Sequence, residues 1–274
     1  MTVNLATKYS SVLDQVFTHG SYTEKFVNNK YDFTGAKTVE VYTVTTVAPG
    51  DYDRTETGDR FGGNNELQDT VKAYEIANDK SFKITIDRGN YIQGALAKKA
   101  GEVMKAEMNE QVIPMIDKDR LATVAAGATA VSQAITATAD PYADVLAAQA
   151  DLDEAKAPLE GRVIMVTPDF YNSIKAKIVT TMFASGYNDK LVSKGFVGEL
   201  DGVPVVKVPS SYFPAKTSAC IWHRDALLGV KQIQTTKIKT DSEFVDGSIL
   251  MGRFIFDTFV LEAKKYAVAS IVTA

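Results

Sequence analysis

The sequence predicts an α+β protein organised around one strand that is followed by a long helix. In residues 81–87, Phe82, Ile84 and Ile86 alternate with polar residues, which is typical of a strand with one buried face. From Tyr91 the apolar residues recur at helical spacing over about 22 residues, which predicts a rod of roughly 33 Å. Elsewhere β-rich runs and helical patterns alternate along the chain, so the protein contains mixed layers of helix and sheet.

The long helix has a predicted start and a predicted end. Asn90 can cap its first turn, with Gln93 three residues on as a reciprocal partner. Pro114 is expected to end or kink the helix, because proline lacks an N–H donor and its ring clashes with the preceding turn.

Composition indicates a soluble globular protein. The chain has 274 residues, of which 45% are hydrophobic and 23% charged, and its net charge of −4 argues against a basic surface built to grip nucleic acid. Its single cysteine, Cys220, cannot form an internal disulfide and suits a reducing cytoplasm. No secretory signal opens the chain. Residues 121–139 are uncharged but dominated by small residues, which favours a soluble segment, buried or loosely packed, over a membrane helix.

The first 80 residues are predicted to form extended segments, an arm and a long hairpin, without a hydrophobic core of their own. Six apolar residues share one helical face near the N-terminus: Leu5, Tyr9, Val12, Leu13, Val16 and Phe17. The rest of residues 1–35 shows little periodicity and is typical of an arm that becomes ordered on another surface, often another subunit. Residues 38–47 and 70–76 predict two strands joined by a polar, Gly-rich connection of about 20 residues, whereas hairpin connections normally take 2–5. Such a hairpin either packs on its own domain or projects onto a neighbour, and we favour the neighbour because a two-stranded ribbon is marginal alone.

Residues 140–231 predict a compact α/β or α+β module. Asp140-Pro141 and Thr167-Pro168 are helix-start signals, in which a capping side chain precedes a proline of the first turn. Five strands are expected, at residues 162–166, 196–200, 203–208, 218–222 and 227–230.

The C-terminal part is expected to return to the long helix. Residues 233–239 predict a strand, residues 240–247 an acidic loop, and residues 253–262 a strand that is apolar on both faces at its centre. We expect this last strand to pair with residues 81–87, so that the sheet is built from distant parts of the chain. A short apolar run at 267–272 closes the chain.

The chain offers few groups for catalysis. His223 and Cys220 would lie on opposite faces of one strand, and His19 lies in the arm, so neither histidine is placed as a catalytic base. The sequence has no nucleophile elbow and no phosphate-binding loop. The Gly-rich residues 58–63 indicate a flexible hairpin tip and not a phosphate-binding loop. Five further carboxylates are expected to serve solvation and helix capping: Asp117, Asp119, Asp151, Asp153 and Glu154. We therefore predict no enzyme activity, no cofactor and no metal site.

Taken in order, these segments resemble the major capsid proteins of tailed bacteriophages, which have the Hong Kong 97 fold. The local sequences that carry the resemblance are Lys37-Thr38-Val39-Glu40-Val41, Gly50-Asp51-Tyr52, Phe82-Lys83-Ile84-Thr85-Ile86-Asp87, Thr167-Pro168-Asp169-Phe170-Tyr171, Gly202-Val203-Pro204-Val205-Val206, His223-Arg224-Asp225-Ala226-Leu227 and Gly252-Arg253-Phe254-Ile255-Phe256-Asp257. None is specific alone, but their order covers nearly the whole chain.

The resemblance implies four parts. Residues 1–35 would be the N-arm and 36–80 the E-loop, which lies on the adjacent subunit. Residues 81–119 with 232–265 would form the P-domain with its spine helix. Residues 120–231 with 266–274 would form the A-domain around the capsomer axes.

The implied function is structural. Pentamers and hexamers would close into an icosahedral shell that encloses double-stranded DNA without reading its sequence, in a virion assembled in the host cytoplasm. Scaffolding, portal and decoration proteins are expected partners, and no interaction with a membrane is expected. The sequence carries no N-terminal scaffold segment of roughly 100 residues, so a separate scaffolding protein acts, or the segment was removed, or none is needed. The alternative is an encapsulin, a shell of the same fold that encloses a cargo enzyme.

Some members of this family join subunits by an isopeptide bond between an E-loop lysine and a P-domain asparagine. This chain has no lysine between Lys37 and Lys72, and residues 240–247 contain no asparagine. The resemblance therefore implies a shell held by non-covalent contacts. Seven residues are candidate inter-subunit contacts, in which the acidic loop pairs with arginines of a neighbour's hairpin: Asp51, Tyr52, Arg54, Arg60, Asp241, Glu243 and Asp246.

Overall fold

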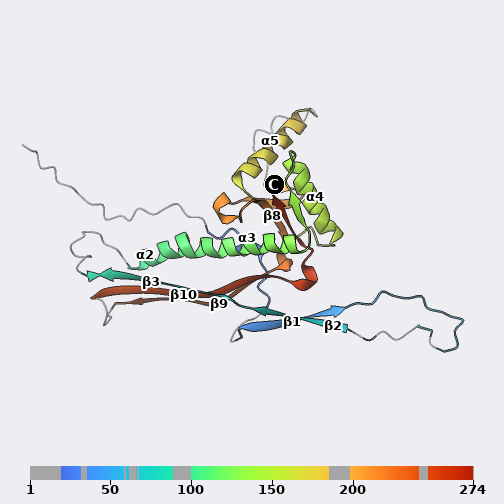
Figure 1. Cartoon of the computed structure of the whole chain (residues 1–274), viewed down its shortest axis with the longest axis horizontal. Coiled ribbons are helices and arrows are strands. Elements are labelled where there is room, and N and C mark those ends of the chain that lie inside the picture. The colour runs from blue at the N-terminus through green and yellow to red at the C-terminus, as the bar shows by residue number, and fades with distance from the viewer. Residues whose placement is uncertain are drawn as a thin grey trace, which may run out of the picture. The chain divides into compact units, whose positions relative to one another are not determined.

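A computed structural model describes residues 20–31, 36–58, 60–61, 66, 68–88, 100–184, 198–240 and 246–273. The chain divides into two compact units, one comprising Phe33–Ile76 and the other the remainder. Among the described residues the strands form sheets of two, three and six strands. The smaller unit holds the two-stranded sheet and the larger unit holds the other two (Figure 1).

The smaller unit is an antiparallel ribbon of β1 (Thr38–Thr45) and β2 (Gln68–Glu75), as the sequence predicted. Tyr42 lies directly opposite Val71, and Val44 is two residues further along β1, so the three side chains share one face. They are 64%, 45% and 54% exposed respectively. A ribbon with an uncovered apolar face lacks the second layer that normally stabilises a sheet.

The three-stranded sheet of the larger unit confirms the predicted return of the chain. Its order is β3 (Asn78–Asp87), β10 (Gly247–Val260) and β9 (Leu227–Lys239), and Ser81 lies opposite Arg253. The prediction of two separate strands in residues 227–239 was wrong. β9 is continuous, but its register against β10 shifts between Ile255 and Phe256. The extra residue of this bulge interrupts the twofold alternation, which is why the sequence indicated a break.

The long helix continues through Pro114 and does not end there, where the sequence predicted an end or a kink. It consists of α2 (Ala100–Glu107), a π-helical turn (Met108–Val112) and α3 (Ile113–Ala130). Ile113 N donates to Met108 O, five residues back, and Pro114 follows in the first turn of α3. The π-turn changes the hydrogen-bond register of the helix before Pro114. The proline, which has no N–H donor and a bulky ring, therefore lies in the first turn of a new helical segment, where both are tolerated. The expected cap at Asn90 lies outside the described residues.

Replacing Pro114 by alanine should leave the subunit folded, because alanine is the best helix former and retains the apolar contact area nearby. The alanine N–H can restore an ordinary α-helical turn, which would change the path of the helix. We expect shells of altered size or poor closure, measured by electron microscopy. A subunit that loses its folded circular dichroism signal would instead show that Pro114 has a local stabilising role.

The long helix packs on the three-stranded sheet (Figure 1). Val112 packs with Phe254 and Phe256 of β10, and the Phe82 ring stacks on the Phe254 ring at a centroid distance of 6.0 Å. Phe82 also lies over Gly252, where an added Cβ would approach Phe82 Cε1 to 2.4 Å. Glycine at position 252 is therefore needed for the close packing of the ring.

The six-stranded sheet confirms the predicted mixed module. Its strands, in spatial order, are β4 (Ala134–Thr136), β11 (Val268–Val272), β8 (Thr217–His223), β5 (Arg162–Val166), β7 (Val203–Lys207) and β6 (Glu199–Leu200). Helices α4 (Pro141–Glu154) and α5 (Pro168–Ala184) begin at the predicted prolines, and the Asp140 carboxylate accepts from Tyr142 N and Ala143 N. Short 3-10 turns occupy Glu24–Phe26, Ser210–Tyr212, Arg224–Ala226 and Glu262–Lys264.

Strand β5 is buried throughout because both faces of its sheet are covered. Val163 and Met165 belong to the cluster that contains Leu121 of α3. Ile164 and Val166 belong to the opposite cluster, which receives apolar residues from α4 and α5. This arrangement explains why the strand is a continuous apolar run rather than an alternating one. The uncharged residues 121–139 begin in α3, and none of the described helices is long and apolar enough to cross a membrane.

Candidate functional site

The tip of the hairpin contains four of the predicted contact residues and is held by local contacts. The rings of Tyr52 and Phe61 meet edge to face at 5.0 Å. Asp53 N donates to Arg60 O at 3.1 Å, and Arg60 Nε donates to Glu56 O at 2.9 Å. Tyr52 is 49% exposed and Phe61 85% exposed, so the tip presents an aromatic pair. The sequence analysis did not include Phe61 among the contact residues, although an aromatic side chain in a polar, Gly-rich connection was a signal.

Of the acidic loop at residues 240–247, the structure describes residues 240, 246 and 247. Asp241 and Glu243 lie outside the described residues, and Asp246 accepts a hydrogen bond at its carbonyl oxygen from Arg88 N at 2.7 Å. The loop and the hairpin belong to different units, so the pairing of Arg54 or Arg60 with this loop stays a prediction.

Asp117 anchors the root of the N-terminal arm, which the sequence analysis did not foresee. This side chain is fully buried, contrary to its expected role in solvation or capping. Its Oδ1 accepts from Ser21 Oγ and from Thr23 Oγ1, each at 2.6 Å, and its Oδ2 accepts from Tyr22 N at 2.9 Å. A buried carboxylate is stable in an apolar environment only when its oxygens are hydrogen-bonded, and these three donors meet that need.

Arg120, one turn further along α3, extends the anchor. Arg120 Nη1 donates to Thr23 Oγ1 at 2.9 Å and to Glu24 Oε2 at 2.8 Å, and Lys231 Nζ contacts Glu24 Oε1 at 2.6 Å. Burial raises the pKa of Glu24, but hydrogen bonds and charge from Lys231 and Arg120 outweigh it and leave the pKa below its usual value. The buried charges of α3 therefore fix the arm root, defined here as residues 21–28, in one register.

The backbone of the arm root is held by the larger unit as well. Trp222 Nε1 donates to Phe26 O at 2.8 Å, and Arg224 Nε donates to Val27 O at 3.3 Å. Asn28 N donates to Leu227 O at 2.8 Å, and Gly229 N donates to Asn28 O at 3.0 Å. The described end of the predicted arm thus lies on its own chain, whereas the amphipathic residues 5–17 lie outside the described residues.

Two other acidic residues of the predicted solvated set also have structural partners. Asp119 accepts from Thr258 Oγ1 at 3.0 Å and from Asn78 Nδ2 at 3.3 Å, and burial raises its pKa. Asp153 accepts from Arg162 Nη2 at 2.6 Å, and the arginine side chain is buried. The sequence analysis did not predict these hydrogen bonds. The partners of Asp119 are distant along the chain, and the partner of Asp153 lies in an otherwise apolar strand.

Two of the groups considered for catalysis, Cys220 and His223, have structural roles, and His19 lies outside the described residues. Cys220 is fully buried and burial raises the pKa of its thiol. His223 Nδ1 accepts from Asp225 N at 3.1 Å, and its Nε2 lies 3.0 Å from Glu160 O. Both ring nitrogens therefore have backbone partners. In the part of the chain that the structure describes, no group of three His, Cys, Asp or Glu residues could hold a metal ion.

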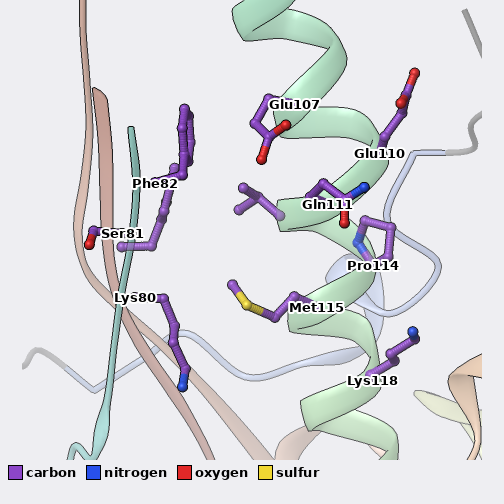
Figure 2. A pocket seen from close by; sticks show the side chains of 11 residues that line it. Lys80, Ser81, Phe82, Glu107, Glu110, Gln111, Pro114, Met115 and Lys118 are labelled. Carbon is purple, nitrogen blue, oxygen red and sulfur yellow. The ribbon is translucent and has the colours of Figure 1, made fainter. Parts of the chain in front are cut away.

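A groove of about 450 Å³ lies between the long helix and strand β3. Its lining includes Phe82, Met115 and Phe254 as apolar surface and Glu107 and Lys118 at its rim (Figure 2). The groove runs beside the π-turn, and its rim charges are separated along the helix.

A family model described as phage capsid protein matches residues 76–269, which is most of the chain. The chain belongs to the phage capsid protein family. A comparison with curated proteins found no match.

Solved phage structures share the fold over nearly the full length of the chain. A chain from Mycobacterium phage Che8 is 18% identical, with a TM-score of 0.72, and the match covers 99% of this chain and 98% of that one. The capsid structure of cyanophage P-SCSP1u has 14% identity and a TM-score of 0.76, with 99% and 93% coverage. The mature capsid of bacteriophage PhiM1 has 12% identity and a TM-score of 0.75, with 99% and 92% coverage.

The family and the fold confirm the predicted Hong Kong 97 fold and the resemblance to a major capsid protein of a phage. The protein is a structural component of the virion capsid, and copies of it assemble into an oligomeric shell. None of these comparisons supports the encapsulin alternative.

Proposed function

We propose that this capsid protein forms pentamers and hexamers that close into an icosahedral shell around double-stranded DNA, and that it has no enzymatic activity. Assembly takes place in the host cytoplasm, with scaffolding, portal and decoration proteins as candidate partners. The net charge of −4 suits a wall that does not pin the DNA. Many modest contacts per subunit can stabilise a closed shell because they add through multivalency.

The observation that carries the proposal is the incomplete β1–β2 ribbon in a chain of the phage capsid family. Tyr42, Val44 and Val71 form an exposed apolar face, and Tyr52 and Phe61 an exposed aromatic tip. Exposed apolar surface of this kind marks a protein–protein contact. We assign this contact to a second copy of the chain.

The four-part division implied by the resemblance belongs to this proposal. The N-arm comprises residues 1–35, the E-loop 36–80, the P-domain 81–119 with 232–265, and the A-domain 120–231 with 266–274. Within the proposal, the E-loop lies on the P-domain of a neighbour, and the acidic loop of that neighbour pairs with Arg54 or Arg60 of the E-loop.

Electron microscopy of the purified assembly tests the function. We expect hollow icosahedral shells when the protein is expressed with its scaffolding partner, and nuclease-protected DNA in particles from infected cells. Shells that enclose a protein cargo and no DNA would contradict the proposal, as would a protein that stays monomeric under all these conditions.

The shell should contain no covalent links between subunits. The hairpin connection between Lys37 and Lys72 offers no lysine nucleophile, and the loop at 240–247 offers no asparagine electrophile. Mature particles boiled in detergent should therefore run as one band at the mass of the subunit on a denaturing gel. A ladder of covalent oligomers would refute this prediction.

A further inference from the structure

The ring of His223 is held by two backbone groups. Its Nδ1 accepts a hydrogen bond from Asp225 N at 3.1 Å, and its Nε2 lies 3.0 Å from Glu160 O. A carbonyl oxygen only accepts hydrogen bonds, so Nε2 carries the proton and Nδ1 carries a lone pair. Both contacts are therefore made by one neutral tautomer of the ring.

The backbone beside the ring is shaped to admit these contacts. Gly161 has a φ of 92°, and a Cβ added there would lie 3.1 Å from His223 Nε2. Arg224 N donates to Gly161 O at 2.8 Å, so residues 160 and 161 accept both from the ring and from the 3-10 turn Arg224–Ala226. The His223 ring thus caps this turn at its N-terminal end.

The capped turn holds the chain where the arm root ends. Arg224 Nε donates to Val27 O at 3.3 Å, and the backbone of Asn28 pairs with residues that follow the turn. Lys30 Nζ lies 3.3 Å from Asp225 Oδ1. The chain from Val27 to Lys30 is therefore held by the turn itself and by the residues next to it.

A proton on Nδ1 is incompatible with the hydrogen bond that caps the turn. Histidine is the side chain that gains a charge as the pH falls from about 8 to about 5. A proton taken up from solvent at Nδ1 replaces the lone pair by an N–H group, which then faces the N–H of Asp225. The charged ring also competes with Lys30 for the Asp225 carboxylate. Burial raises the pKa of that carboxyl group, but the hydrogen bond from Lys30 and the positive charges nearby outweigh it and leave the pKa below its usual value, so the group is ionised wherever a histidine titrates.

The other charges around the ring act in both directions. The titratable side chains that line a cavity of about 270 Å³ together with the ring are Lys156, Asp225, Lys264 and Tyr266. The two lysines oppose protonation of the ring, and the carboxylate favours it. On β5, Arg162 lies opposite His223, but its guanidinium is bound by Asp153 and by backbone carbonyl groups.

We propose that His223 is a pH-sensitive latch: its neutral ring holds the turn at residues 224–226 and, through that turn, residues 27–30, and protonation of Nδ1 releases both. Residues 27–30 precede the hairpin, so the latch determines whether the connection to the hairpin begins from a fixed or a released segment. The latch is a contact inside one subunit and goes beyond the proposed shell function.

Amide hydrogen exchange of the full-length, unassembled subunit tests the latch at about pH 8 and about pH 5. Rates are expressed as protection factors, in which the intrinsic pH dependence of exchange is divided out. From the higher to the lower pH, we expect protection of the Asn28 and Asp225 amides to fall by about threefold or more, which is the effect of losing a hydrogen bond. Residues 21–26 and α4 are internal controls, because their hydrogen bonds do not involve the ring.

The matched variant is His223→Asn, because asparagine Oδ1 can accept from Asp225 N and does not titrate. It should keep similar protection factors at both pH values, whereas His223→Ala should show low protection at both. His19, the other histidine of the chain, is unchanged in both variants.

Three outcomes would overturn the latch: equal protection of the unmodified chain at the two pH values, a loss in His223→Asn as large as in the unmodified chain, or an equal loss in residues 21–26. The second and third would show that a group other than His223 titrates. The measurement is made on unassembled subunits, so its failure leaves the shell function untouched.

Discussion

Deleting residues 51–65 should give a subunit that folds normally and does not assemble. The deletion removes the exposed aromatic pair Tyr52 and Phe61, whose rings contact each other in the hairpin tip. Both core clusters of the six-stranded sheet lie outside the deleted segment, so the folded circular dichroism signal should persist. Assembly is measured by sedimentation and electron microscopy. Normal shells from this variant would contradict the assignment of the hairpin to an inter-subunit contact.

A charge-reversal series separates loss of contact from loss of loop length. Arg54→Glu with Arg60→Glu keeps the full hairpin, and we expect it to lower the yield of shells. If the acidic loop is the partner, reversal of Asp241, Glu243 and Asp246 to lysine should restore that yield. If the variant that carries both the arginine and the acidic-loop reversals assembles no better than the arginine variant, this pairing is excluded. The assignment of the hairpin to an inter-subunit contact would not be affected.

Asp117→Ala should destabilise the subunit by roughly 3 kcal/mol, because it leaves three donors of the arm root without their buried acceptor. Urea denaturation measures the change in the free energy of unfolding. The matched control is Glu154→Ala, which removes an exposed carboxylate at the end of α4 and should change that free energy by less than about 0.5 kcal/mol. Equal effects of the two variants would show that Asp117 does not anchor the root.

The same variant should release the arm root. With Asp117 replaced, amide hydrogen exchange of residues 21–28 should accelerate more than exchange in α4, whose buried apolar residues belong to a core cluster that contains no residue of the arm root. Uniform acceleration throughout the subunit would instead indicate global destabilisation.

The sequence determined the elements whose cause is local. Strand β3 followed from the alternation of Phe82, Ile84 and Ile86, and the start of α4 followed from Asp140 and Pro141. Local capping and side-chain periodicity act within a few residues, so they can be recognised without a partner. The pairing of β3 with β10 was also predicted, because a strand that is apolar on both faces requires a covered position in a sheet.

Tertiary structure alone decided the features that depend on distant partners. The π-turn moves the hydrogen-bond register of the long helix before Pro114, so a residue expected to end or kink the helix lies in the first turn of its second α-helical segment. The carboxylate of Asp117 has the sequence pattern of a solvated side chain, yet it is buried because the arm root, some 95 residues away, supplies its donors. Burial of a charge is a property of its partners, and a sequence does not state which distant residues will meet it.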